Sequence, residues 1–116
     1  FERSGVSGSM NAVTYDYVSG NLKNINFIHN TFVDPGTIDF SSGATVNTWA
    51  NNIFVKSSGD LFSGSSLGIT WVNNFYWGTT LVATPGLTKI DPKLALNADG
   101  YYGLSLNSPA INATVA

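Results

Sequence analysis

The sequence predicts an all-β fold, a right-handed parallel β-helix in which short strands stack from one coil to the next. Composition is the first observation: one Glu, no Gln and five Lys plus Arg leave few of the residues that fill exposed helix faces. Asn, Ser, Thr and Gly instead number 13, 13, 11 and 12, which favours strands joined by many turns. An internal repeat of about 22 residues is the second observation, and this period is too short for helical hairpins or propeller blades. Parallel β crossovers are right-handed, so we expect that hand.

The repeat is carried by three segments that align without gaps at a constant offset: 24–33 (NINFIHNTFV), 46–55 (VNTWANNIFV) and 68–77 (GITWVNNFYW). Four columns recur at this step: Phe27, Trp49 and Trp71; Asn30, Asn52 and Asn74; Phe32, Phe54 and Tyr76; and Val18, Phe40 and Phe62. Each repeat is expected to form one coil of short strands, stacked about 4.8 Å from the next. We therefore expect about four coils, at residues 1–23, 24–45, 46–67 and 68–89.

The Asn column interrupts the alternation of inward and outward residues within each coil. We expect each Asn to mark a bend, because Asn tolerates left-handed backbone better than other non-Gly residues. Stacked Asn side chains can also hydrogen-bond from coil to coil. Asn30, Asn52 and Asn74 are therefore predicted to form a structural ladder, whereas Asn26 is expected to face solvent.

The end of the chain leaves the repeat from Ile90 onward, with Pro92, Pro109 and an Asp99-Gly100 turn. We expect residues 1–89 to form the coils and residues 90–116 to form a tail that covers the end and side of the last coil. Such a cover is expected because bare strand edges invite pairing with other chains.

The beginning of the chain shows no comparable cap, because Phe1–Gly8 is short and rich in small residues. The first residue is Phe and no signal peptide is visible, so residues upstream are expected. The first coil is then expected to be exposed, covered by upstream coils, or docked on another copy of the chain.

Charge and residue usage exclude several classes of function. The net charge of −2 argues against nucleic-acid binding, and no apolar run approaches the roughly 18–20 residues of a membrane span. The absence of Cys excludes thiol catalysis and Cys-ligated zinc, and the single His makes a Ser-His-Asp triad improbable.

The coil pattern and the tail together resemble the polysaccharide-lyase family of alginate lyases and chondroitinase B, which are right-handed parallel β-helix proteins. The resemblance is carried by NFIHNTFVDPG (26–36), WANNIFV (49–55), GITWVNNFYWG (68–78) and IDPKLALNADGYYGLSLNSPAIN (90–112). It covers the back portion of such an enzyme. It implies a secreted or periplasmic protein that cleaves an acidic polysaccharide by β-elimination.

In that family a Lys acts as base, an Arg assists, and calcium held by Asn and Glu offsets the uronate charge. The family's Lys and Arg match no position here, and Glu2 is the only Glu. The resemblance therefore assigns no catalytic residue, metal ligand or cofactor to this segment, although calcium is possible in the parent enzyme. This segment is expected to be mainly structural.

Several residues could have a binding or catalytic role, but each also has a simpler structural explanation. Trp77, Tyr101 and Tyr102 could bind carbohydrate by stacking on sugar rings, although packing of Phe75 and Trp77 beneath the tail is favoured. Surface positions are favoured for the remaining polar candidates, which are Glu2 and Arg3 at the start, Lys23, His29 and Lys56 in the repeat, and the uneven row Asp16, Asp39 and Asp60.

Two other functions stay open. A structural module could stack end to end through its first coil, which predicts association that depends on concentration. A carbohydrate-binding or adhesin β-helix could act without catalysis, which predicts that Trp77→Ala weakens glycan binding and leaves the fold intact.

Overall fold

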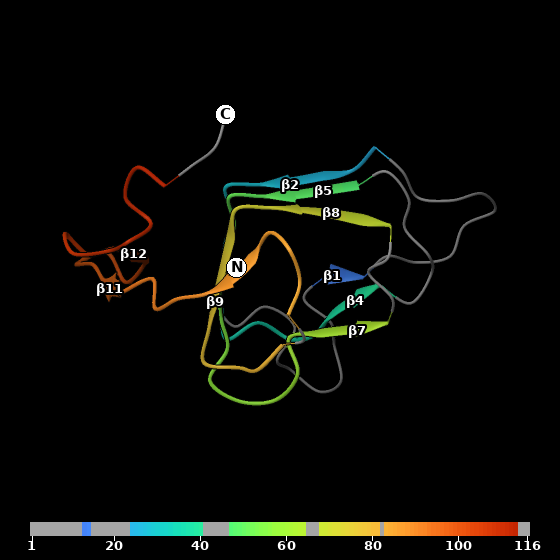
Figure 1. Cartoon of the computed structure of the whole chain (residues 1–116). Coiled ribbons are helices and arrows are strands. Elements are labelled where there is room, and N and C mark those ends of the chain that lie inside the picture. Colours follow the sequence, from blue (N-terminus) through green and yellow to red (C-terminus); the bar gives the residue numbers. More distant parts are fainter. Residues whose placement is uncertain (1–12, 15–23, 41–46, 65–67, 82, 114–116) are drawn as a thin grey trace.

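The computed structural model describes residues 13–14, 24–40, 47–64, 68–81 and 83–113, and within them all regular elements are strands (Figure 1). The twelve strands are β1 (Val13–Thr14), β2 (Asn26–Ile28), β3 (Thr31–Val33), β4 (Ile38–Phe40), β5 (Asn47–Ala50), β6 (Ile53–Val55), β7 (Phe62–Gly64), β8 (Ile69–Val72), β9 (Asn74–Trp77), β10 (Leu87–Lys89), β11 (Leu94–Leu96) and β12 (Tyr102–Leu104). The predicted all-β class is confirmed.

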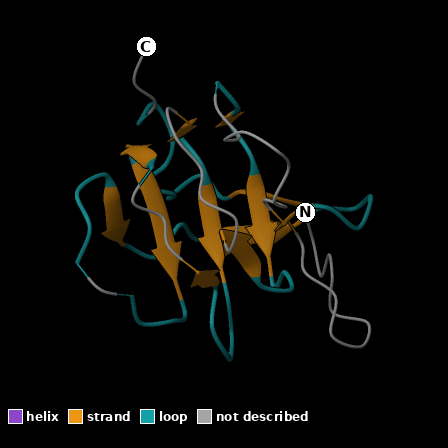
Figure 2. Cartoon of the chain, turned by 90° about the vertical axis from the view of Figure 1, so that its right-hand side faces the viewer, coloured by secondary structure: helices purple, strands orange, loops and turns teal. Residues whose placement is uncertain are grey.

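Ten of these strands form three parallel sheets, ordered β2-β5-β8, β10-β9-β6-β3 and β1-β4-β7. Consecutive repeats contribute neighbouring strands, so that β2, β5 and β8 run side by side along one edge of the molecule in Figure 1. Figure 2 shows strands of successive repeats running in the same direction. This arrangement is compatible with a parallel β-helix.

Register within two of the sheets follows the step of the repeat. Phe27 pairs with Trp49, and Trp49 pairs with Trp71. In the neighbouring sheet Phe54 pairs with both Phe32 and Tyr76. The columns seen in the sequence are therefore ladders of stacked side chains, to which each repeat contributes one residue.

The fourth column, Val18, Phe40 and Phe62, was predicted wrongly. In the structure Phe62 pairs with Ile38, and Phe40 pairs with Gly64, so the step from β4 to β7 is two positions longer than the 22-residue step of the repeat. The linker before β7 has six residues (56–61), against four (34–37) before β4. The linker after β7 has four (65–68), against six (41–46) after β4, so the two changes cancel before the next sheet. Val18 lies outside the described residues.

The last strand of the large sheet, β10, follows β9 after fewer residues than the repeat predicts. Leu87 of β10 pairs with Asn74 of β9, a much shorter step along the chain than the one from Phe54 to Tyr76. The chain thus reaches a new layer of this sheet within the fourth predicted coil. The predicted division at residues 89 and 90 stays a prediction.

The C-terminal segment adds an antiparallel hairpin of β11 and β12, in which Leu94 pairs with Leu104 and Leu96 with Tyr102. It projects from the side of the parallel sheets in Figure 1. Ser108 is buried beside it and donates its hydroxyl to the Pro92 carbonyl at 2.5 Å, which joins the two ends of this segment.

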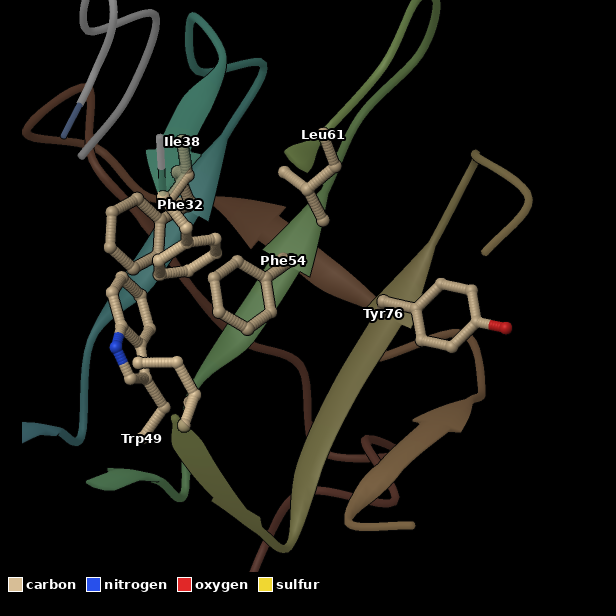
Figure 3. Packing of buried hydrophobic residues seen from close by; sticks show 8 residues of the cluster. Phe32, Ile38, Trp49, Phe54, Leu61 and Tyr76 are labelled. Carbon is tan, nitrogen blue, oxygen red and sulfur yellow. The ribbon is translucent and has the colours of Figure 1, made fainter. Parts of the chain in front are cut away.

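The hydrophobic core lies between the three parallel sheets. Trp49 is fully buried and stacks on Phe27 at 4.1 Å between ring centroids, with Phe32, Phe54 and Trp71 within 5.9 Å. In Figure 3 Trp49, Phe32 and Phe54 gather side by side, with Ile38 above them. The four largest fully buried side chains, Trp49, Phe32, Phe40 and Phe54, are therefore all aromatic residues of the repeat.

None of the described residues belongs to a helix long and apolar enough to cross a membrane. Among the residues singled out in the sequence, Glu2, Arg3, Asp16 and Lys23 lie outside the described ranges.

Candidate functional site

An inner row of amide side chains runs along the corner between the β2-β5-β8 sheet and the large sheet. Asn52 Oδ1 accepts hydrogen bonds from the backbone N and the Nδ2 of Asn30, at 2.9 and 3.2 Å. Asn74 Oδ1 accepts the same two bonds from Asn52, at 3.0 and 2.9 Å. Asn52 and Asn74 are buried, so these bonds satisfy amide groups that would otherwise be stranded in the core.

The left-handed backbone expected at these Asn residues occurs one position earlier. The φ angles of His29, Asn51 and Asn73 are 58°, 55° and 52°. Each of these residues turns the chain at the corner, so that the next side chain points inward. The prediction of left-handed backbone at Asn30, Asn52 and Asn74 is therefore wrong in position, although His and Asn are types that tolerate it.

The turning residues themselves form an outer row on the same corner. Asn73 Nδ2 donates to Asn51 Oδ1 at 2.9 Å and also to the backbone carbonyl of Ala113 in the C-terminal segment. His29 occupies the next position of this row and is exposed. Sequence analysis missed the row, although the paired amides Asn51-Asn52 and Asn73-Asn74 recur at the same step.

A third buried amide, Asn47, was also missed. It is fully buried, and its Oδ1 accepts a hydrogen bond from the Ile25 backbone N at 2.7 Å. The signal was present, because Asn47 stands in the inward column between Ile25 and Ile69, where an unpaired amide is costly.

The outer row borders a cavity of about 210 Å³ between the large sheet and the C-terminal hairpin. The sheet wall consists of the outward residues Thr31, Ile53 and Phe75, one from each of β3, β6 and β9. The hairpin wall is formed by Leu94, Tyr102, Gly103 and Leu104, and Ala110 and Ala113 close the end. The cavity is therefore mainly apolar, with amide groups along one side.

The three aromatic residues predicted to bind carbohydrate are separated by the structure. Tyr102 lines the cavity and is 40% exposed, whereas Tyr101 and Trp77 are not among its lining residues and are 70% and 40% exposed. The tail thus covers the Phe75 column, and the expected burial of Trp77 beneath it is wrong. Tyr102 opens β12 on the cavity side, and Tyr101, which precedes the strand, stays outside the cavity.

The polar candidates of the repeat are placed apart from this cavity, except for His29. Lys56 donates its Nζ to the Pro35 carbonyl. Ser63 donates its hydroxyl to Asp39 at 2.8 Å, and Asp60 borders a different hollow beside Trp71. Within the described part of the chain, no three His, Asp or Glu side chains come together as a metal-binding group.

No protein-family model, curated protein or solved structure matches this chain.

Proposed function

We propose that this chain forms coils of a right-handed parallel β-helix in a secreted polysaccharide lyase. Its repeats would act as the scaffold of that enzyme, which cleaves an acidic polysaccharide. The observation that carries the scaffold role is the inner Asn row, in which one side chain from each repeat hydrogen-bonds to the next through a constant step of 22 residues. Stacked, in-register amides of this kind fix one layer of strands on the next.

The orientation of the repeated columns supports a scaffold. Phe32, Phe54 and Trp49 are fully buried, and Asn52 and Asn74 are buried with their amides paired inside the molecule. These are the positions that the repeat holds constant in type. Because they point into the core, they stabilise the stacking and do not touch a polymer outside it.

The link to polysaccharides is supported by the resemblance of residues 26–36, 49–55, 68–78 and 90–112 to alginate lyases and chondroitinase B. In such an enzyme the Lys, Arg and calcium ligands would lie on coils that precede these.

Two measurements test the proposal. Peptide mapping of the native protein by mass spectrometry is expected to find coils contiguous with and upstream of Phe1. Alginate and chondroitin sulfate incubated with the native protein are expected to gain unsaturated ends, detected by ultraviolet absorbance, and the 116-residue chain alone is expected to produce none. A native protein that begins at Phe1, or one that leaves acidic polysaccharides intact, contradicts the proposal.

A further inference from the structure

We propose that the cavity between the large sheet and the C-terminal hairpin binds one uncharged sugar ring. This site goes beyond the scaffold role, and it rests on the proposed function only in taking a glycan as the source of the ring. The chemical class of the ligand follows from the walls of the cavity.

Size is the first constraint. The cavity measures about 210 Å³. Pockets for drug-sized ligands span about 300–1,000 Å³. A single small ring fits this space, and a stretch of several rings does not. Tyr102 and Leu104 are 40% and 43% exposed, so they border the opening through which a ring would enter.

The apolar walls form the second constraint. Phe75 and Ile53 from the sheet oppose Leu94, Tyr102 and Leu104 from the hairpin. A pyranose presents C–H groups on its faces and hydroxyls around its edge, so its faces suit aromatic and aliphatic walls. Tyr also carries a hydroxyl at the end of an apolar ring, which suits a site that is apolar inside and wet at the opening.

The amide row supplies the third constraint, because it offers hydrogen-bonding groups at the edge of the cavity. Asn73 Nδ2 uses both of its protons, on Asn51 Oδ1 and on the Ala113 carbonyl. No described residue donates to Asn73 Oδ1, and the exposed His29 imidazole has no hydrogen-bond partner among the described residues. These two groups are available to the hydroxyls of a ring.

The ligand is expected to be uncharged. The lining residues among the described part of the chain include no Lys, Arg, Asp or Glu. Apolar walls disfavour a carboxylate, and the described lining residues offer it only the amide groups and the His29 imidazole at the edge as hydrogen-bonding partners. A uronate is therefore expected to bind more weakly than the corresponding neutral sugar.

The Asn73–Ala113 hydrogen bond joins the outer row to the C-terminal segment at one end of the cavity, so that this end is closed in the structure. Preformed walls lower the ordering cost of binding. This favours detectable binding of a single ring.

Two-dimensional amide NMR of the 116-residue chain, titrated with methyl glycosides of glucose, galactose and mannose and with glucuronate, tests the proposal. At least one neutral glycoside is expected to shift signals of Asn73, Phe75 and Tyr102, and to bind at least five-fold more tightly than glucuronate. Failure of all neutral glycosides to shift these signals overturns the proposal, and so does tighter binding of glucuronate.

Matched variants separate the cavity from the surface aromatics. Tyr102→Ala is expected to weaken binding at least ten-fold, and its neighbour Tyr101→Ala is expected to change it less than two-fold. Thr31→Trp is expected to block binding by filling the cavity from the sheet wall, with Thr70→Trp at the exposed position of β8 as its control. Binding lost in Tyr101→Ala, or kept in Thr31→Trp, contradicts the cavity. Because these readouts use no lyase assay, their outcome is independent of the proposed enzyme.

Discussion

Asn74 donates both its backbone N and its side-chain Nδ2 to one acceptor, the carbonyl oxygen of Gly86, at 2.8 and 3.3 Å. In the two preceding layers the same pair of donors meets the Oδ1 of the next Asn in the row. The Gly86 carbonyl therefore takes the place of a fourth Asn side chain. The inner row ends with its donors satisfied although β10 belongs to a shortened layer, in which Leu87 already pairs with Asn74.

Gly86 is expected to be the least replaceable glycine of this end of the molecule. Its φ is +85°, and a Cβ there would overlap the Trp71 carbonyl. Gly100 has the same φ with nothing near its Cβ, so it is a matched control. Gly100→Ala is expected to cost about 1–2 kcal/mol for left-handed backbone alone. Gly86→Ala is expected to cost clearly more in urea unfolding, and equal costs would contradict the role of this close approach.

The inner row predicts that Asn52→Leu is strongly destabilising. The substitution removes the acceptor of Asn30 and the donor to the Phe27 carbonyl, which lies 2.9 Å from Asn52 Nδ2. Each buried polar group left unsatisfied costs about 1–3 kcal/mol. The control is Asn26→Leu, because Asn26 is exposed. Thermal unfolding followed by circular dichroism compares the two, and similar melting temperatures would count against the row.

The aromatic stack predicts a large difference between two Trp residues. Trp49 is fully buried, whereas Trp77 is 40% exposed. Trp49→Ala is expected to lose about 3–5 kcal/mol of unfolding free energy, a value typical of a deleted core aromatic. Trp77→Ala is expected to lose much less and to leave sugar binding in the cavity unchanged. A comparable loss for the two variants in chemical denaturation would show that Trp77 packs as part of the core.

The compensating linkers around β7 predict that only their total length matters to the neighbouring sheets. The connections from β3 to β5 (34–46) and from β6 to β8 (56–68) are equally long, and deletion of Ser58 and Gly59 makes the second one shorter. The deletion is expected to strain both corners and to lower the melting temperature by about 4–8 °C, the equivalent of about 1 kcal/mol. Adding Gly-Ser after Gly64 to the same variant is expected to restore most of the loss. No rescue would show that the linker 56–61 is needed for its own contacts.

The 22-residue step predicted the strand register correctly where the residues of a column are separated by segments of equal length. Phe27, Trp49 and Trp71 are in register because the segments that join them have equal length. Phe40 and Phe62 are displaced by two positions, because a residue count cannot tell where inside a repeat the extra residues lie. The centroids of their rings still lie 5.7 Å apart. The aromatic pattern therefore predicted that these two residues are neighbours, but not that they are out of register.

The candidate site was predictable only in part. Tyr102 was singled out as an aromatic residue, but its separation from Tyr101 depends on the pairing of β12 with β11, which the repeat does not encode. The cavity brings Phe75 together with a tail that lies much further along the chain, including Leu94 and Ala113. The outer row of His29, Asn51 and Asn73 was within reach, because it follows the same step as the inner row.

The shortened last layer is also expected to affect which strands unfold locally first. Strand β9 has hydrogen-bonded neighbours on both sides, β6 and β10, whereas β7 and β8 have one partner strand each among those described. Amide protons of β9 are therefore expected to exchange with deuterium more slowly than those of β8, although the two strands are adjacent in the chain. Because the chain returns early at β10, strand β9 is paired on both sides. We therefore expect local opening to be slower in the large sheet, which forms one wall of the cavity.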